Sequence, residues 1–466
     1  MTVGLARVTV SAPQRRVDVA LPEQVPLAEV LPELLRHAGV GLADDGERHG
    51  GWLLRRADGS MLATGQALLA QGVRDGEVLH LVPARAQWPE LAYDDVAEAI
   101  ADGARRRGDA WSPRATRAAA FAAAAVPLAV GLLSLAAGGS GEPAGWLAAS
   151  LVAALLLLAG TALSRAQGDG LAGATVGGYA LPYGALAGAL AVSSGDPVGP
   201  FGPLRWIGAA ELLAGSVALL LVSVLGLLGV ATGQRVFVAG VVVGAASGLT
   251  ALGALLLGPA GAGATLLCVL ALAIGAIPLL AIRLGRVPLP PVDLPTGTPN
   301  DPYGARDLPD RGRVYAAVAR TEEMLTGMLI GHAVLAAAAA MVLGVTGGSA
   351  GRLLVGVCSA VLLLRARLFV AVRHRVPPLL AGLGGYAVLG ASLAGVAGPA
   401  ARLALAAGAV LIALLAVAGG ATYARRPVSP YVGRVADLAD TALVVSVVPI
   451  TCAVLGLYER ARGLLG

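Results

Sequence analysis

Histidine and cysteine are the residues of this chain whose side chains could hold a metal or attack a substrate. The spacing of the histidines does not match a zinc site, because zinc ligands usually come in pairs a few residues apart. Each cysteine lies within an apolar run, where a thiol behaves as a small buried hydrophobe. The histidines are His37, His49, His80, His332 and His374, and the cysteines are Cys268, Cys358 and Cys452. We therefore predict no metal site and no disulfide.

One short string could hold a nucleophilic serine. Residues 347–351, GGSAG, match the pattern G-x-S-x-G, but that motif needs a strand before it and a helix after it. Apolar segments lie on both sides, so we expect Ser349 in a short loop between two membrane spans. The chain also contains no lysine, which excludes a P-loop and a Schiff base. We predict no catalytic residue, no cofactor and no enzyme activity.

Ionisable residues near the middle of a membrane would point to ion or proton transport. The carboxylates nearest the apolar segments are expected at or outside their ends, and Arg365 and Arg367 can reach the interface by snorkelling. His332 is the exception, and a lone histidine at this position is more often a hydrogen-bonding residue between packed helices than a proton relay. The carboxylates concerned are Glu211, Glu322, Glu323, Asp437 and Asp440.

The composition places most of the chain in a lipid bilayer. Hydrophobic residues make up 56% of the sequence and charged residues only 14%, against roughly 25% charged residues in an average soluble domain. A span takes around 20 apolar residues, and from residue 118 to the end, 118–466, the sequence predicts an all-α membrane domain of about eleven helices. The expected spans are 118–137, 145–163, 171–192, 207–230, 236–257, 262–282, 325–345, 352–372, 378–397, 400–423 and 441–457.

The arginines predict how these spans are oriented. No signal peptide opens the chain, so we expect the N-terminus in the cytoplasm. Twenty arginines then flank the spans on the cytoplasmic side, and five lie on the other side: Arg205, Arg352, Arg402, Arg460 and Arg462. This excess follows the positive-inside rule and accounts for the net charge of +5 without nucleic acid. An odd number of spans places the C-terminus outside the cytoplasmic membrane.

Residues 1–84 are polar enough to fold in water as a separate α+β domain. Alternating apolar residues predict two strands around a turn at Ala12–Arg15, and Pro26 opens an amphipathic helix that ends near Gly39. A strand at Trp52–Arg56, a short return strand at Met61 and Leu62, and a last strand at Val78–Val82 complete the domain. This order resembles a ubiquitin-like β-grasp, with a generic small α+β domain as the alternative. We expect an interaction module.

Two longer polar segments interrupt the sequence, one between the two domains and one within the membrane domain. Residues 85–117 form the expected helical, basic linker, in which Tyr93–Arg107 ends in three arginines that meet the anionic inner leaflet. The long proline-rich loop from Arg283 to Glu323 separates six spans from five. It is either a tether or a docking surface.

Two sets of residues are candidates for contacts with other helices or proteins. Gly240, Gly244 and Gly248 recur every four residues, a spacing that lets helices approach closely. They mark either internal packing or a contact with another subunit. Arg55 and Arg56, in the N-terminal domain, are candidates for docking a cytoplasmic partner.

The architecture resembles EccD, a membrane component of the actinobacterial type VII (ESX) secretion machinery. The resemblance covers the whole chain and rests locally on Gly72–Leu79 (GVRDGEVL), Tyr93–Ile100 (YDDVAEAI) and Arg283–Pro291 (RLGRVPLPP). It implies a scaffold that pairs with a second copy around a lipid-filled vestibule. It also implies that the cytoplasmic domains brace the EccC ATPase beside EccB and EccE, with EccC as the energy source.

Two other functions compete with this hypothesis. A secondary transporter or permease with a cytoplasmic regulatory domain would need a polar site at mid-membrane with broken helices, for which Pro127, Pro182, Pro278 and Pro449 are the only hints. An intramembrane enzyme would need a paired nucleophile and base, which the sequence lacks.

Overall fold

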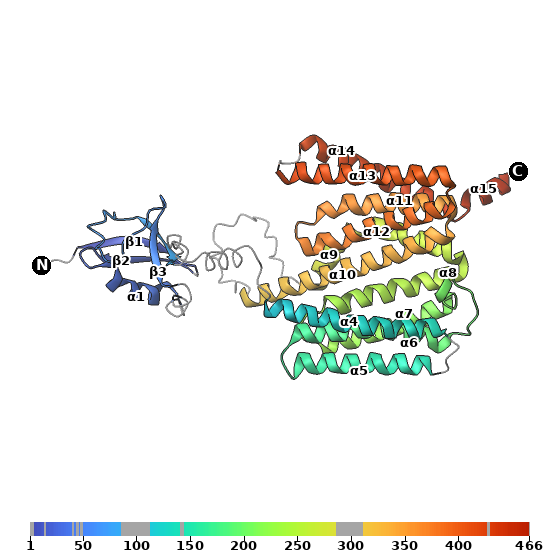
Figure 1. Ribbon diagram of the computed structural model, residues 1–466, viewed down its shortest axis with the longest axis horizontal. Coiled ribbons are helices and arrows are strands. Elements are labelled where there is room, and N and C mark those ends of the chain that lie inside the picture. The colour runs from blue at the N-terminus through green and yellow to red at the C-terminus, as the bar shows by residue number, and fades with distance from the viewer. Residues whose placement is uncertain are drawn as a thin grey trace, which may run out of the picture. The chain divides into compact units, whose positions relative to one another are not determined.

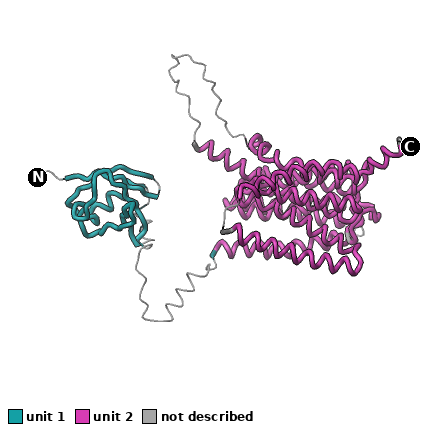
Figure 2. Tube along the Cα trace, turned by 90° about the horizontal axis from the view of Figure 1, so that it is seen from above, with its two compact units in different colours: residues 1–112 teal, residues 113–466 magenta. Residues whose placement is uncertain are grey.

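The computed structural model describes residues 4–13, 15–39, 42, 46, 50–84, 112–139, 144–285, 311–425 and 429–465. The chain divides into two compact units, Met1–Ser112 and Pro113–Gly466, which Figure 2 colours separately. The predicted helical linker at Tyr93–Arg107 and most of the proline-rich loop lie outside the described residues. Each unit is considered by itself below.

Among the described residues of the first unit, four strands form a sheet that helix α1 covers. Strand β1 pairs with β2 in antiparallel fashion and with β4 in parallel, while β3 lines the far side of β4. The order across the sheet is therefore β2-β1-β4-β3. The elements are β1 (Leu5–Ser11), β2 (Arg16–Pro22), α1 (Leu27–Ala38), β3 (Trp52–Arg56) and β4 (Val78–Pro83). This arrangement confirms the predicted β-grasp.

The alternation of apolar residues along the strands builds the core of this unit. Val8 and Val10 on β1 and Leu79 on β4 are buried against Leu27 and Leu34 of α1. The helix begins after Pro26, whose fixed φ suits a helix start. The predicted return strand at Met61 and Leu62 is shorter than expected. It consists of a single antiparallel bridge between Arg55 and Met61.

The second unit is a bundle of long helices (Figure 1). Ten of the described helices are long and apolar enough to cross a membrane. In order, the bundle contains α4 (Pro113–Gly138), α5 (Gly145–Arg165), α6 (Gly170–Val192), α7 (Ala209–Gly229), α8 (Arg235–Ala273), α9 (Ile277–Gly285), α10 (Arg311–Thr346), α11 (Gly348–Arg365), α12 (Val372–Val396), α13 (Pro399–Arg425), α14 (Pro430–Val454) and α15 (Leu457–Leu465).

Helix α8 explains why ten long helices agree with about eleven predicted spans. Its 39 residues include a break at Gly258, where φ is 69° and ψ is 174°, followed by Pro259. This backbone conformation is essentially restricted to glycine, and proline cannot continue the hydrogen bonding of the helix. The predicted spans 236–257 and 262–282 fall on either side of this break.

Contacts with α10 show that α8 reverses direction at the break. The first half of α8 starts beside the middle of α10, whereas the second half starts beside the end of α10 and then returns along it. The pairs are Val238 with Gly327, Gly263 with Leu343, and Leu270 with His332. The two halves therefore cross the bundle as a helical hairpin, so the ten long helices among the described residues make eleven passes across the bundle when α8 is counted twice.

Helix α14 begins at Pro430, before the expected span at 441–457, so Asp437 and Asp440 lie within the helix. The expected position of Ser349 is wrong. Ser349 lies in the first turn of α11, so the predicted loop shrinks to a sharp turn at Gly347 and Gly348. The turn needs glycine because Gly348 has a φ of 59°.

Candidate functional site

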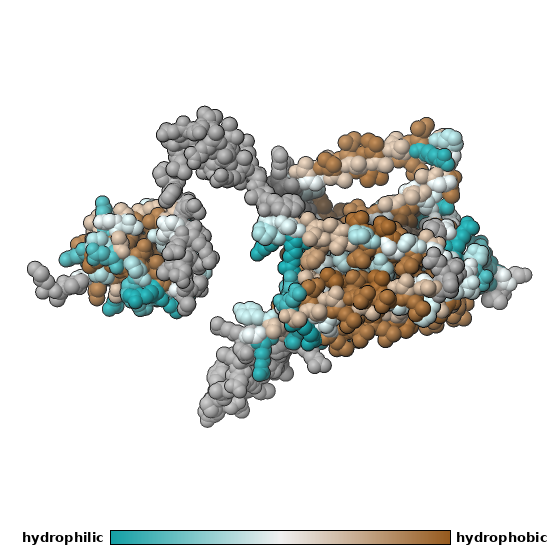
Figure 3. All heavy atoms as spheres, turned by 60° about the horizontal axis from the view of Figure 1, so that its bottom comes forward, coloured by the Kyte–Doolittle hydropathy of each residue, from teal (hydrophilic) through white to brown (hydrophobic). Residues whose placement is uncertain are grey.

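Ion pairs between helices gather at one end of the bundle, where α4 and α8 begin and α11 ends. Figure 3 shows hydrophilic side chains collected over this end and a hydrophobic belt beside it. Each pair joins residues far apart in sequence, so each one ties two helices together. The pairs are Arg117–Asp169, Arg235–Glu323, Arg373–Glu322, Arg365–Asp440 and Arg367–Asp437. This cluster is the candidate functional site and is called the clasp below.

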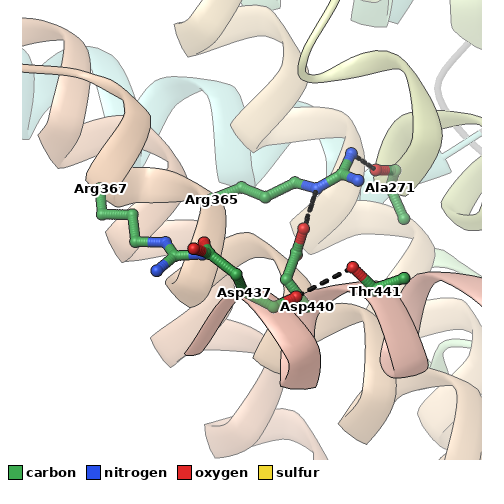
Figure 4. Close-up of polar contacts among 6 residues, drawn as sticks. All are labelled: Ala271, Arg365, Arg367, Asp437, Asp440 and Thr441. Atoms are coloured by element: carbon green, nitrogen blue, oxygen red, sulfur yellow. Dashed lines mark hydrogen bonds and ion pairs between the residues drawn. The ribbon is translucent and has the colours of Figure 1, made fainter. Parts of the chain in front are cut away.

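Arg365 occupies the most enclosed position in the clasp. Its Nε atom lies 3.2 Å and 3.3 Å from the two carboxylate oxygens of Asp440, and its Nη1 atom donates to the carbonyl oxygen of Ala271 at 3.0 Å. Figure 4 shows the guanidinium between these two acceptors. The side chains of Arg365 and Asp440 are only 18% and 19% exposed. One arginine of α11 is thus bound to both α14 and α8.

The position of Ala271 explains why this contact forms. Ala271 lies in the last turn of α8, which ends at Ala273, and carbonyls in a last helical turn lack partners within the helix. Arg365 supplies the missing donor, which matters in a bilayer because an unpaired carbonyl there costs free energy. The guanidinium therefore stabilises the turn that joins the end of α8, at Ala273, to the start of α9, at Ile277.

Arg367 forms a second, more open pair with Asp437, three residues before Asp440. The Arg367 Nη1 atom also lies 3.4 Å from the carbonyl oxygen of Gly433. Asp437 is 72% exposed, so solvent screens this pair more strongly than the Arg365 pair. In addition, the Thr441 hydroxyl donates to the Asp437 carbonyl oxygen at 2.9 Å. The two pairs together fix the end of α11, and the 3-10 turn Ala366–Leu368 that follows it, to the first half of α14.

Asp169 shows how the sequence shapes the clasp locally. This residue precedes α6 and caps it, because its carboxylate accepts a hydrogen bond from the backbone N–H of Ala172 at 3.0 Å. The same carboxylate pairs with Arg117 of α4. The Ala172 hydrogen bond, followed by the Arg117 contact, lowers the pKa of Asp169 below its ordinary value. Asp169 is therefore ionised at neutral pH and holds α4 against α6.

The clasp is suited to holding helices together. Each of its carboxylates already has an arginine partner, so none is placed as a free general base. Among the described residues, no group of three or more histidine, cysteine or acidic side chains could hold a metal ion. The chemistry available in the clasp is electrostatic attachment.

His332 lies inside the bundle, as its position in the sequence predicted. Its side chain is buried, and Nε2 lies 2.9 Å from the carbonyl oxygen of Leu270. This is the helix-to-helix hydrogen bond expected of it.

The glycine repeat of α8 faces α7. Gly240 and Gly244 are buried, and side chains at these positions would meet Ser223 and Leu220 of α7. Gly248 is less enclosed and lies near Ser216. The close approach that the repeat permits is therefore made between helices of one chain, and a role in a subunit contact remains a prediction.

The two arginines of the predicted docking surface have different surroundings. Arg56 pairs with Glu77 at 3.3 Å and donates to the Gln71 carbonyl oxygen, and it is only 22% exposed. Arg55 alternates with it along β3 and lies opposite His80 of β4 on the outer face of the sheet. Arg56 therefore already bonds with residues of its own domain. Of the two arginines, Arg55 is the one that could contact a partner, and its role in docking remains a prediction.

The sequence did not reveal the Arg365–Asp440 pair. The two residues are 75 positions apart, and the sequence placed Asp440 outside the last span. One signal could have found it: opposite charges flanking two spans at the same predicted membrane face. That signal alone does not decide which arginine meets which carboxylate.

The fold and the clasp define a multi-pass membrane protein with an N-terminal ubiquitin-like domain. Two family models match the chain: the EccD-like transmembrane domain over residues 116–464, and protein YukD of the WXG100 protein secretion system over residues 5–81. The chain therefore belongs to the EccD family.

Relatives agree with this assignment over nearly the full length. The ESX-4 secretion system protein eccD4 of Mycobacterium tuberculosis is 30% identical over 487 aligned residues, covering 99% of this chain and 98% of that protein.

Two solved structures share the fold. One, the structure of protomer 1 of the ESX-3 core complex, has a TM-score of 0.59 and 24% identity and covers 98% of this chain and 99% of its own. The other, the MycP5-free ESX-5 inner membrane complex in State II, has a TM-score of 0.54 and 22% identity and covers 91% of this chain and 100% of its own.

Proposed function

We propose that the chain is a structural membrane subunit of a type VII secretion complex. The family match across the whole membrane unit carries this proposal, and the clasp supports it physically. Each ion pair of the clasp fastens helices to one another, which suits a rigid scaffold more than a site that binds and releases ions.

The proposed orientation places the N-terminal domain in the cytoplasm and the C-terminus outside. Eleven passes put the start of α4 and the end of α14 on opposite sides of the membrane. The clasp and the excess of arginines then belong to the cytoplasmic face, in agreement with the positive-inside rule.

The ubiquitin-like domain is the proposed docking module for the EccC ATPase, with EccB and EccE as further partners. The outer face of its sheet supports this role, because Leu53 and Val82 lie beside Arg55 and His80. A face that combines apolar and charged side chains is typical of a transient protein interface.

A second copy of the chain is the proposed partner within the membrane. The most apolar stretches of α4 and α13 contain no buried residues. Peripheral helices of this kind can contact lipid or another subunit without rearranging the bundle.

Purification of the tagged full-length chain from its native membrane in mild detergent tests the scaffold. The expected result is a complex containing a second copy, a P-loop ATPase and other membrane subunits. Recovery of a monomer that transports a solute in liposomes would contradict the scaffold and favour a permease.

The Arg55→Glu variant tests the docking surface within the same preparation. Losing about 1.4 kcal/mol of binding free energy weakens affinity tenfold, so we expect the recovered ATPase to fall by about that factor while the chain stays in the membrane. Arg36→Glu is the matched control, because Arg36 is exposed on α1, on the other face of the sheet. Undiminished ATPase recovery after deletion of residues 1–84 would refute docking through this domain.

A further inference from the structure

A groove of about 530 Å³ lies along the bundle between α11, α12 and α14. Its walls are mostly apolar, with Ser349, Arg352 and Tyr386 as the polar side chains that line it. Leu353, Val357 and Ala360 of α11, Leu389 and Leu393 of α12, and Leu443 of α14 contribute to them, and Arg352 lies at one end. The Arg352 end of the groove is opposite the clasp, because Arg352 is near the start of α11 and the clasp is at its end. The other end of the groove, at Ala360 and Leu443, comes within about two helical turns of the Arg365–Asp440 pair.

The length of the groove matches one leaflet of a bilayer. From Ser349 to Ala360 the groove follows twelve residues of α11, and the eleven steps between them correspond to about 16 Å at 1.5 Å per residue. The hydrocarbon core of a bilayer is about 30 Å thick. The groove therefore runs from one face of the membrane to about its middle, as an acyl chain of that leaflet does.

Arg352 provides a charge at the membrane face of the groove. Its Nε atom donates to the Ser392 hydroxyl at 2.8 Å, and that hydroxyl donates to the carbonyl oxygen of Gly344 at 2.6 Å. These contacts fix the side chain between α10, α11 and α12. Among the described residues, no carboxylate pairs with Arg352, and no residue forms a hydrogen bond with its two terminal guanidinium nitrogens. The five arginines of the clasp, in contrast, are all paired.

We propose that this groove binds an anionic phospholipid. One acyl chain lies along the apolar wall, and the lipid phosphate pairs with the guanidinium of Arg352, whose planar set of N–H donors matches phosphate oxygens. Basic pockets between membrane helices recognise anionic headgroups in this way. A helix from another chain would cover the same wall but leave Arg352 without a counter-charge. In the orientation proposed above, the lipid belongs to the outer leaflet.

Native mass spectrometry of the full-length chain in mild detergent tests the site, with phosphatidylglycerol and phosphatidylcholine added to delipidated protein. We expect the wild type to retain one phosphatidylglycerol in preference to phosphatidylcholine, and Arg352→Gln to bind it about tenfold more weakly. Arg402→Gln is the matched control, because Arg402 lies at the same end of the bundle, on α13, and bonds only the Ala394 carbonyl oxygen among the described residues. This control should retain the lipid.

A second variant separates loss of the lipid from loss of the fold. Gly356 lines the groove, and a Cβ atom there would lie 3.2 Å from Leu389. The Gly356→Leu substitution therefore fills the groove and leaves Arg352 unchanged. We expect it to lose the lipid and keep the elution volume of the wild type. Equal lipid retention by wild type, Arg352→Gln and Gly356→Leu would overturn the proposal. So would cross-linking of Leu353→Cys to a second copy or partner subunit, with no phospholipid retained by the wild type.

Discussion

The guanidinium of Arg365 has acceptors on two other helices, the Asp440 carboxylate on α14 and the Ala271 carbonyl on α8. A charge pair enclosed to this degree gives little net stability when intact, but removing one partner leaves the other uncompensated. A charged pair inside a membrane protein often marks a transport pathway. Here the additional bond to the end of α8 makes attachment of helices the simpler function.

Replacing Arg365 with alanine should destabilise the bundle by about 3–5 kcal/mol, because Asp440 would keep its charge without a partner. Thermal unfolding of the detergent-solubilised chain, followed by tryptophan fluorescence, measures the loss. Arg367→Ala is the control and should cost about 1 kcal/mol or less, because its partner Asp437 is exposed. Equal melting temperatures for Arg365→Ala and the wild type would show that the clasp does not hold the bundle.

Asp169 should make stability depend on pH in the acid range. Its pKa is lowered in the folded chain, so its contribution is fully present above the ordinary aspartate pKa of about 4 and is lost as the pH falls through the lowered value. Asp169→Asn keeps a capping side chain but loses the charge. The gap in melting temperature between wild type and Asp169→Asn should therefore begin to narrow as the pH falls below about 4, and it should close once the pH is below the lowered pKa. If the difference in melting temperature became larger at acid pH, the pKa of Asp169 would not be lowered in the folded chain.

At the scale of elements, the helical hairpin of α8 depends on the backbone of one residue. Gly258 has a conformation open only to glycine, and nothing lies within 4 Å of the position where a Cβ would be added. Any cost of substitution therefore comes from the backbone and not from crowding.

Gly258→Ala should destabilise the chain by about 1–3 kcal/mol through this strain. Gly253→Ala, five residues earlier in the same helix, is the control. Gly253 also has open space around it and is helical, so alanine there should be neutral or slightly stabilising. Thermal melting of both variants in the same detergent measures the difference in stability. Identical melting temperatures for Gly258→Ala and Gly253→Ala would argue against a strained backbone at Gly258.

The elements that the sequence predicted well are those encoded by local patterns. Alternating residues such as Val8 and Val10 predicted strands, and the lengths of the apolar runs predicted the passes, including the two halves of α8. The charges of Asp437 and Asp440 placed both residues outside the last expected span, and the sequence did not predict that they lie within helix α14 and pair with Arg365 and Arg367. Such pairing depends on which helices pack together, and single-sequence patterns do not contain that information.

At the scale of the whole molecule, the number of passes decides what the chain can connect. In the proposed orientation, eleven passes place the ubiquitin-like domain and the end of α15 on opposite sides of the membrane, so that a single subunit would reach the cytoplasm and the exterior at once. This geometry suits a component that holds a cytoplasmic ATPase to a membrane assembly. An even number of passes would place both ends on the same side.

Labelling of single engineered cysteines with a membrane-impermeant maleimide on intact cells tests this topology most directly. Ala70→Cys lies in the N-terminal domain and Gly463→Cys lies in α15, both exposed, whereas the native Cys268, Cys358 and Cys452 lie within the membrane helices. We predict that Gly463→Cys is labelled on intact cells and that Ala70→Cys is labelled only after the cells are opened. Labelling of both positions, or of neither, before opening would contradict the eleven-pass scaffold.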